Sequence, residues 1–449
     1  MSEPTHSPFS RYQLAELAAP GSDTFVDGPF GSSLKSHEYV DAGVRLIQLQ
    51  NIGEGEWRDE NKKFITARKF KTLERHGAVP GDIAIAKMAD PVARACLVPP
   101  VSEQFVVVAD CIRLRLDESR FDAGYVVRSI NSPYTRREAE NKAIGSTRVR
   151  INLSVLKTVG CLAPALPEQR EIARILDTFD TAIHETEAII AKLRAVKQGL
   201  LHDLLTRGIA ANGELRPPQS EAPHLYKESP LGWIPKEWGV NQLAELLADV
   251  DPAMRSGPFG SALLKQELVD AGVPLLGIDN VHTERFVADY TRFVTPRKFA
   301  QLARYAVRPD DLMITIMGTV GRCCLVPEDV GQALSSKHTW TISLNQDAYS
   351  PYLAMLQVNY SPWVLGHFAR DQQGGTMAAI RSDTLRSTQL PAPPRREQHL
   401  MEERLREVGA RIDLEIESLA KRHAEKSGLM DDLLTGRVRV TPLLESAAP

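Results

Sequence analysis

Cysteine is scarce in this sequence: the chain has only five, and no two of them form a Cys-x-x-Cys pair. That spacing is typical of zinc sites, so its absence argues against a structural metal and for reduced thiols in a cytoplasmic protein. Long apolar runs are also missing, since none approaches the ~18 residues that span a bilayer. The N-terminus has no basic start followed by an apolar core, so we expect neither a secretory signal nor a membrane partner.

Positive charge is not in excess either. Lys and Arg number 54 against 57 Asp and Glu, which gives a formal net charge of −3. The whole chain is therefore not a polycation, and any nucleic-acid-binding surface must be a local concentration of positive charge. The chain has 449 residues, of which 43% are hydrophobic and 25% are charged. These values predict an ordinary globular protein of about three folding units.

An internal repeat organises the chain. Gly28-Pro-Phe-Gly-Ser32 recurs as Gly257-Pro-Phe-Gly-Ser261, and Asp41-Ala-Gly-Val44 recurs as Asp270-Ala-Gly-Val273, both at an offset of 229 residues. A period this long is not that of a solenoid. It indicates a duplicated domain, each copy with its own trailing helix.

The repeat and the distribution of proline predict six segments. They are a first domain over 1–166, a long helix over 167–207, an irregular Pro- and Gly-rich connector over 208–241, a second domain over 242–394, a second long helix over 395–437 and a frayed tail over 438–449. Within the first domain, residues 44–49 and 83–86 resemble strands, and 32–40 and 66–76 resemble short helices with Ser32 and Thr66 as N-caps.

Both long helices carry apolar residues at alternating steps of four and three, the pattern of a coiled-coil seam. Such a stripe would be left in water on a lone helix, so we expect the two helices to pair with each other, antiparallel. The predicted seam residues are Ile172, Leu176, Phe179, Ile183, Ile190, Leu193, Leu200, Leu204, Met401, Leu405, Val408, Ile412, Leu419, Leu429 and Leu433.

Several segments resemble catalytic motifs without completing them. Residues 28–35 resemble a phosphate-binding loop, but no glycine directly precedes the lysine. Asn131-Ser-Pro-Tyr134 resembles an amino-methyltransferase motif, but the second copy reads Tyr360-Ser-Pro-Trp363, without the amide. Asp82 and Lys87 suggest a metal nuclease, yet no acid stands two residues before the lysine. We therefore expect no catalytic, cofactor-binding or metal-binding residue in this chain, and a binding or scaffolding role.

Local positive charge is found in both copies, over 57–75 and 292–308. Such patches can supply the non-specific part of DNA affinity, and Arg, Lys, Asn and Gln side chains can read base edges. The candidate DNA-binding residues lie in these patches or in loops. They are Gln50, Asn51, Lys62, Lys63, Arg68, Lys69, Arg94, Arg148 and Arg150 in the first copy, and Asn280, Arg292, Arg297, Lys298, Arg322, Lys337, Gln372 and Gln373 in the second.

The combined pattern resembles the specificity (S) subunit of type I restriction–modification enzymes. The phrases that carry the resemblance are the repeated Gly-Pro-Phe-Gly-Ser, Met317-Gly-Thr-Val-Gly321, the Leu166-Pro-Glu-Gln169 entry to the first long helix and Ser229-Pro-Leu-Gly-Trp233 before the second copy. The chain departs from the pattern at Lys87-Met-Ala-Asp-Pro91, and at 395–398, where the second long helix opens with Arg-Arg-Glu-Gln.

The resemblance implies an α+β fold: two homologous mixed α/β target recognition domains joined by two long antiparallel coiled-coil helices with pseudo-two-fold symmetry. It implies that each domain reads one half of a bipartite, asymmetric site in double-stranded DNA, while the helices set the gap and dock two methylation subunits. S-adenosylmethionine, ATP and magnesium would be used by the methylation and restriction subunits, not by this chain. Two alternatives stay open: a fused DNA methyltransferase or nuclease with an unfamiliar site, and a coiled-coil scaffold without a DNA role.

Overall fold

The structure is a computed structural model of the chain, and it describes residues 7–29, 33–88, 91–102, 104–145, 149–372 and 380–446. The chain divides into two compact units. Unit 1 comprises Met1–Ala188 and Glu417–Pro449, and unit 2 comprises Ile189–Ile416. Each unit therefore holds one predicted domain together with part of both long helices, so the compact units do not follow the predicted domain boundaries.

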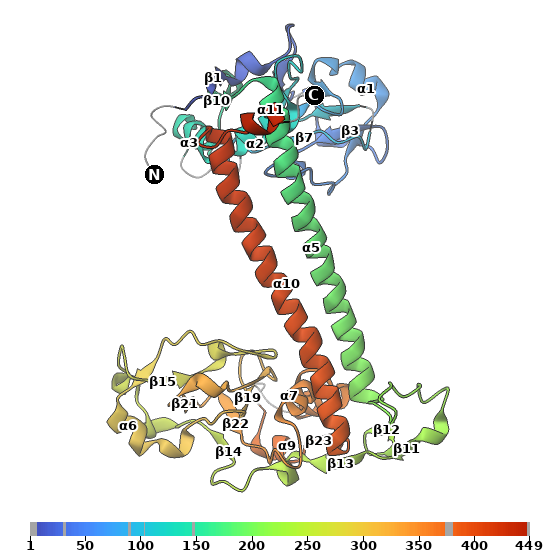
Figure 1. Cartoon of the computed structure of the whole chain (residues 1–449), viewed down its shortest axis with the longest axis vertical. Coiled ribbons are helices and arrows are strands. Elements are labelled where there is room, and N and C mark those ends of the chain that lie inside the picture. The colour runs from blue at the N-terminus through green and yellow to red at the C-terminus, as the bar shows by residue number, and fades with distance from the viewer. Residues whose placement is uncertain are drawn as a thin grey trace. The chain divides into compact units, whose positions relative to one another are not determined.

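Unit 1 is built on two four-stranded sheets and one two-stranded ladder (Figure 1). Its strands are β1 (Ser10–Gln13), β2 (Phe25–Asp27), β3 (Val44–Ile47), β4 (Phe64–Ile65), β5 (Gly77–Ala78), β6 (Ile83–Ala86), β7 (Ala95–Leu97), β8 (Phe105–Val107), β9 (Cys111–Leu114) and β10 (Gly160–Ala163). The sheets have the orders β2-β9-β6-β7 and β4-β3-β8-β5. Strands β3 and β8 run parallel, and β1 pairs antiparallel with β10. The first strand of the domain thus closes against its last, just before the long helix.

Unit 2 repeats this topology. Its strands are β11 (Tyr226–Ser229), β12 (Gly232–Pro235), β13 (Gly239–Gln242), β14 (Met254–Ser256), β15 (Val273–Leu276), β16 (Val281–His282), β17 (Arg285–Phe286), β18 (Phe293–Val294), β19 (Leu312–Thr315), β20 (Cys323–Leu325), β21 (Leu334–Ser335), β22 (Thr339–Ile342) and β23 (Gln389–Ala392). The order β14-β22-β19-β20 matches β2-β9-β6-β7, and β18-β15-β21 matches β4-β3-β8, including its parallel pair. Strand β13 closes on β23 as β1 closes on β10.

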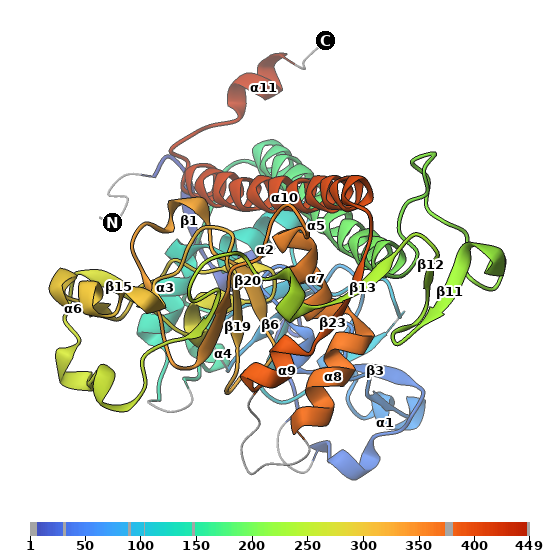
Figure 2. The same cartoon turned by 90° about the horizontal axis from the view of Figure 1, so that it is seen from below.

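Short helices cover the sheets, and most begin at a side chain that caps them. The helices are α1 (Ala67–Lys71), α2 (Ala123–Asn131), α3 (Pro133–Lys142), α4 (Leu153–Leu156), α5 (Leu166–Thr206), α6 (Pro296–Gln301), α7 (Pro351–Tyr360), α8 (Pro362–Gln372), α9 (Ser382–Arg386), α10 (Arg395–Thr435) and α11 (Thr441–Ser446). In unit 2, α7 lies beside β19 and β20 (Figure 2). The predicted N-cap Thr66 is confirmed, since its hydroxyl accepts from the Lys69 amide at 3.1 Å.

Two predicted helices of the first domain are shorter than expected. The helix capped by Thr66 ends at Lys71, and a 3₁₀ turn over Glu74–His76 follows it. Of the helix predicted over 32–40, the described part holds only a 3₁₀ turn over Ser36–Glu38, and Ser32 itself lies outside the described residues. Glu38 accepts from the Lys35 amide at 2.8 Å, and the turn ends at Tyr39, whose backbone is extended.

The two long helices, α5 and α10, each run for 41 residues and agree closely with the predicted bounds. In unit 1 the beginning of α5 packs with the end of α10: Ile172 and Leu176 share a core with Leu433. In unit 2 the end of α5 packs with the beginning of α10: Leu204 shares a core with Met401 and Leu405. Both units therefore pair the helices antiparallel, as the seam predicts, and the predicted fold class is confirmed.

The other seam residues are also withdrawn from solvent. Ile183, Ile190 and Ile412 are buried, as is Thr186, the one polar seam residue of α5 besides Lys197. The remaining predicted seam residues are half-buried: Phe179, Leu193, Leu200, Val408, Leu419 and Leu429. In unit 1 the seam is not closely packed throughout, since Phe179 and Arg422 line a gap of about 410 Å³ between the helices.

The Glu-Gln pair at the start of each long helix joins the helix to its surroundings. Gln169 accepts from the Asp122 amide at 2.9 Å and donates to the Pro164 carbonyl at 2.9 Å. Gln398 makes the equivalent bonds, accepting from the Ser350 amide at 2.8 Å and donating to the Pro393 carbonyl at 2.8 Å. This glutamine fixes the start of the helix to the domain before it, which explains why both copies carry it.

The glutamate of the pair binds the segment that follows the other long helix. Glu168 binds Arg439 through two bonds of 2.7 Å, and Glu397 binds Arg216 and accepts from the Ile209 amide at 2.8 Å. The expectation of a frayed tail over 438–449 is therefore wrong for its described part. Val440 is buried, and Thr441–Ser446 forms α11. The connector over 208–241 is likewise not wholly irregular, because β11 and β12 form a hairpin within it.

The cores are apolar and contain all five cysteines. Cys96, Cys111, Cys161, Cys323 and Cys324 are buried free thiols, and burial raises the pKa of Cys96 and of Cys324 to about 12. A thiol with so high a pKa is a poor nucleophile, because the thiolate is the reactive form. Among the described residues, no helix is both long enough and apolar enough to cross a membrane.

Candidate nucleic-acid interface

The first basic patch lies around β4 and α1 of unit 1. Lys62, Lys63 and Arg68 are exposed there, because the segment from 58 to 63 is a surface loop and Arg68 lies on the outer face of a helix of five residues. Lys62 pairs with Asp59 at 2.8 Å, and this hydrogen bond lowers the pKa of the Asp59 carboxyl. Lys63 and Arg68 have no carboxylate partner within the described part of the chain, so their charge is free to meet a phosphate.

The second patch lies at the equivalent place in unit 2, around β18 and α6. Arg297 is exposed on α6 and has no carboxylate partner among the residues that the structure describes. Arg292 is half-buried and pairs with Asp279 through one guanidinium nitrogen. The patch is therefore less positive than its sequence suggests, because one of its arginines is partly neutralised.

One lysine in each patch has a structural partner. Lys69 pairs with Glu38 at 2.7 Å, and Lys298 pairs with Glu267 at 2.7 Å, the same pair 229 residues later. The pKa of Glu38 is lowered mainly by its hydrogen bond to Lys69, and that of Glu267 mainly by the backbone amide of Leu264. Each pair holds a 3₁₀ turn against a short helix. The charge of these lysines is therefore neutralised, and their role is to fix the position of the patch.

Three candidate residues are buried, and for them the interpretation as DNA contacts is wrong. Asn51 and Asn280 are 0% and 1% exposed. The amide nitrogen of Asn280 donates to the carbonyls of Val287 and Asp289, and its oxygen accepts from the Gly277 amide. Asn51 makes the same set of bonds in the first domain. No polar atom of either side chain is left for a base.

Arg94 is the third buried candidate, at 9% exposure. Its guanidinium donates to the carbonyl oxygens of Ile52 at 2.6 Å and Leu49 at 2.9 Å. Burial lowers the pKa of Arg94, which is the expected direction when a cation is held by neutral carbonyls. The sequence could not distinguish this arginine from a surface arginine, because its partners lie some 40 residues earlier in the chain.

The remaining candidates are distributed as follows. Gln50 is exposed and bonds to Gln48 at 3.1 Å, and Arg150 is exposed and pairs with Asp110. Lys337 is exposed and Arg322 is half-buried, both at ends of strands in unit 2. Arg148 and Gln373 lie outside the described residues, and Gln372 ends α8, with nothing described of its side chain.

The segments that resemble catalytic motifs have structural partners. Asp82 accepts two bonds from Arg115, at 3.0 and 2.9 Å, and Lys87 contacts Asp27 at 3.1 Å. The Asn131 side chain makes two hydrogen bonds to the backbone of Ala95: it accepts from the amide and donates to the carbonyl. In the second copy, Asn359 makes the same two hydrogen bonds to the backbone of Cys323. Asn359 stands one residue before Tyr360, the position that the 229-residue offset aligns with Asn131. The amide that seemed to be missing is thus present and ties a helix to a strand.

Replacing Asn280 by alanine is expected to cost stability without changing DNA specificity. The substitution leaves two carbonyls and one amide unpaired in a buried turn, which costs about 2–3 kcal/mol. Urea unfolding should report that loss, and the folded variant should select the same DNA sequence as the wild type in a binding assay. A changed recognition sequence in a folded variant would show instead that Asn280 reads DNA.

Comparisons with known proteins agree with this geometry. The sequence profile described as the type I restriction modification DNA specificity domain matches residues 80–195. A type I restriction enzyme specificity subunit of Methanocaldococcus jannaschii, MjaX, is 25% identical over 407 residues, which cover 89% of this chain and 88% of its own. The MjaVIII specificity subunit of the same organism is 23% identical over 343 residues, 75% of each chain. The chain is thus similar to type I restriction–modification specificity subunits over most of its length.

Solved structures support the same fold. The S subunit of a type I restriction–modification system from M. genitalium aligns with a TM-score of 0.55 and 13% identity, covering 97% of this chain and 98% of that one. A chain from a structure on the assembly and conformational transition of the type I R-M system aligns with a TM-score of 0.56 and 14% identity, covering 97% and 100%. Within this fold, the two basic patches lie on equivalent elements of the two repeated domains.

Proposed function

We propose that this chain is the non-catalytic DNA-specificity subunit of a type I restriction–modification complex, in which each recognition domain reads one half of a bipartite DNA site. The observation that carries the proposal is the repeated domain together with the similarity to the MjaX specificity subunit over 89% of this chain. The exposed, unpaired cations Lys63, Arg68 and Arg297 supply phosphate contacts on both domains. A role on DNA is consistent with the cytoplasmic location expected from the sequence.

The two long helices act as the spacer of this complex. Each is continuous for 41 residues, and the antiparallel pairing buries the seam residues near the helix ends in both units. A paired helix resists bending, so it can hold two readers at a fixed separation and set the length of DNA left unread between the half-sites. The same helices dock two methylation subunits, and Ile189, Val196 and Leu414 are exposed apolar side chains on them that fit such a role.

The partner subunits carry the chemistry. Two methylation subunits would bind S-adenosylmethionine and methylate adenine, and restriction subunits would use ATP and magnesium for cleavage. In this chain, the polar groups examined as catalytic candidates are engaged in structural contacts: Asp82 with Arg115, and Asn131 with Ala95.

The function is tested with the purified chain, alone and with its methylation subunit. The chain alone, given S-adenosylmethionine, magnesium and duplex DNA, is expected to transfer no methyl group and to cleave no bond, whereas the complex methylates a defined sequence. Turnover by the chain alone would favour a fused methyltransferase or nuclease. Failure of the complex to retain duplex DNA at low salt would favour a scaffold without a DNA role.

The methylated site is expected to be asymmetric. The two domains share their strand topology but differ in the loops before β9 and β22, at 108–110 and 336–338, where Val-Ala-Asp stands in one copy and Ser-Lys-His in the other. Different side chains at equivalent places present different hydrogen-bonding groups to the bases. Genome-wide mapping of methylated adenines checks this prediction, and a perfectly palindromic site would contradict it.

A further inference from the structure

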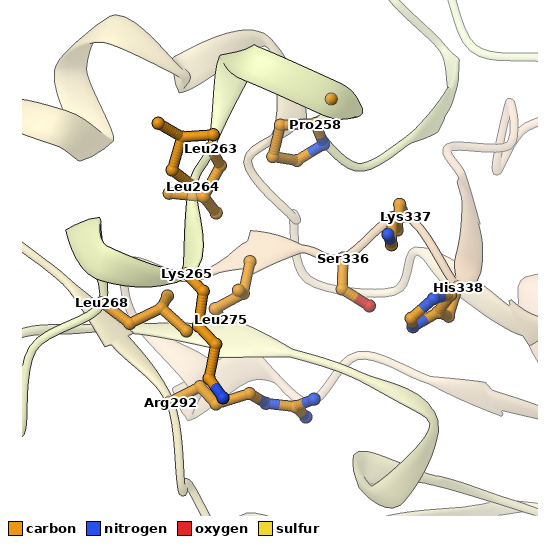
Figure 3. Close-up of a pocket in the computed structure, with 11 residues that line it drawn as sticks. Pro258, Leu263, Leu264, Lys265, Leu268, Leu275, Arg292, Ser336, Lys337 and His338 are labelled. Atoms are coloured by element: carbon orange, nitrogen blue, oxygen red, sulfur yellow. The ribbon is translucent and has the colours of Figure 1, made fainter.

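A small cavity in the second recognition domain has the lining of an anion site. It has a volume of about 210 Å³ and lies between the 3₁₀ turn Lys265–Glu267, strand β15, and the loop that joins β21 to β22 (Figure 3). We name it the Ser336 pocket, after the serine of that loop. Its polar lining consists of Lys265, Arg292, Ser336, Lys337 and His338.

The pocket is positively charged. Lys265 and Lys337 are exposed, and neither has a carboxylate partner within the described ranges. The guanidinium of Arg292 uses one nitrogen for Asp279, but its Nε is buried without a hydrogen-bond acceptor in the described part of the chain. Figure 3 shows Arg292 and Lys265 on one side of the opening and residues 336–338 on the other. No carboxylate lines the cavity as described, so the positive charge there is incompletely compensated.

Ser336 gives an independent indication that a ligand belongs here. The residue is 6% exposed, and its hydroxyl oxygen has no hydrogen-bond partner among the described residues. An unpaired buried hydroxyl costs about 1–3 kcal/mol, so native structures rarely keep one without a reason. The oxygen lies on the cavity side of its loop (Figure 3), where a ligand with acceptor oxygens would satisfy it.

The rest of the lining distinguishes a phosphate ester from a bare ion. Pro258, Leu263, Leu268 and Leu275 form an apolar wall beside the cations. A phosphodiester of a nucleic acid fits both parts of this lining. Its oxygens accept hydrogen bonds from the polar side chains, and the carbons of the adjoining sugar pack against the apolar wall. The pKa of His338 is lowered by its burial first, and then by the charges of Lys337 and Arg292. The same surroundings disfavour a cation as the ligand.

The first domain does not carry this lining. The strand pairing shows which residues of the two copies are equivalent. Leu276 pairs with Ser335 in unit 2, and at the same place in unit 1 Ile47 pairs with Val107. Residues 336–338, Ser-Lys-His, therefore correspond to 108–110, Val-Ala-Asp. The aspartate at 110 pairs with Arg150. The hydroxyl, the lysine and the histidine are thus features of the second domain.

We propose that the Ser336 pocket binds one phosphate of the DNA backbone in the half-site that the second domain reads. This inference rests on the proposed function and deepens it. Lys265 and Lys337 neutralise the phosphate, the Ser336 hydroxyl donates to one of its oxygens, and the leucine wall packs on the adjoining sugar. A phosphate held in this way fixes the register of the second domain on the duplex, which base-reading loops require.

The test uses the full chain assembled with its methylation subunit and a duplex that carries the methylated site. Ser336→Ala removes a hydroxyl that has no partner in the protein, so it is expected to leave the unfolding midpoint unchanged and to weaken DNA binding about tenfold. The double variant K265Q/K337Q is expected to weaken binding at least as much. It should also flatten the dependence of log affinity on log salt by about 0.9 for each lost contact, with the methylated sequence unchanged.

The matched control is K227Q/K236Q, which removes two exposed lysines from unit 2 in the connector, away from the pocket. It should have at most a small effect on affinity. Duplexes in which single phosphates of the second half-site are replaced by neutral methylphosphonates locate the contact. One position should weaken wild-type binding and have no effect on K265Q/K337Q.

Four outcomes would overturn the proposal. The first is an equal effect of the control and pocket variants on DNA affinity, and the second is the absence of any phosphate position of that kind. The third is a changed methylated sequence in K265Q/K337Q, which would make these lysines base readers. The fourth is binding of inorganic phosphate in the pocket with no change in DNA affinity, which would assign the pocket to a free anion. In each case a complex that still methylates its site leaves the proposed function standing. A complex that retains no DNA would refute both.

Discussion

Replacing Glu397 by alanine is expected to cost about 3 kcal/mol of folding free energy, because it leaves the buried guanidinium of Arg216 with only a 3.4 Å contact to the exposed carboxylate of Glu237. The side chains of Arg216 and Glu397 are only 6% and 8% exposed. The carboxylate also accepts from the Ile209 amide at 2.8 Å and from a second nitrogen of Arg216 at 3.0 Å. Removing it breaks three hydrogen bonds and weakens the neutralisation of a buried cation at the junction of α10 with the connector.

The first copy of the repeat supplies the matched control. Glu168→Ala removes the equivalent carboxylate, but Arg439 is 42% exposed and stays solvated, so the expected loss is about 1–2 kcal/mol. Urea unfolding followed by tryptophan fluorescence measures both, since Trp57 lies in unit 1 and the other four tryptophans lie in unit 2. In the Glu397→Ala background, Arg216→Met should restore part of the stability. Equal losses in the two copies would contradict the argument from burial.

Deleting one heptad from each long helix is expected to shorten the unread gap between the half-sites by about three base pairs. Residues 185–191 of α5 and 414–420 of α10 are equivalent at the offset of 229 and include the seam positions Ile190 and Leu419. Seven residues at 1.5 Å each remove about 10 Å of helix, and a whole heptad keeps the seam in phase. Mapping of methylated adenines by the complex measures the new gap.

A length-preserving exchange is the control for that deletion. Placing 414–420 in α5 and 185–191 in α10 changes the same residues but keeps 41 residues in each helix, so the gap should stay as in the wild type. If the deletion variant forms an active complex and still methylates sites with the original gap, the helices are not the spacer. If both variants shift the gap, side-chain identity and not length sets it.

Much of the architecture could be predicted from local pattern. The duplication, the two long helices and their seam follow from periodicity, because helix formation and amphipathic packing are encoded within a few turns. The observed ends, Leu166–Thr206 and Arg395–Thr435, lie within two residues of those predicted. The predicted N-cap at Thr66 likewise depends only on neighbouring residues. Composition and incomplete motifs favoured a binding role over catalysis, and the absence of catalysis stays a prediction.

The candidate site was predicted less well, and the reason is the distance between partners along the chain. Whether a cation is free or neutralised depends on groups that the fold brings together: Lys298 meets Glu267 from 31 residues away, and Arg94 meets Ile52 from 42. No local pattern separates such residues from Lys63 or Arg297, which remain unpaired in the described structure.

The sequence by itself determined the repeat, the two long helices and the resemblance to specificity subunits. Only the tertiary structure decided which polar groups face solvent. It buried Asn51 and Asn280, turned the expected tail into a docked segment and assembled the Ser336 pocket from residues 265, 292 and 336–338. Local periodicity predicts helices and strands, because these depend on neighbouring residues. Desolvation and ion pairing depend on groups that the fold brings within a few ångströms from distant parts of the chain.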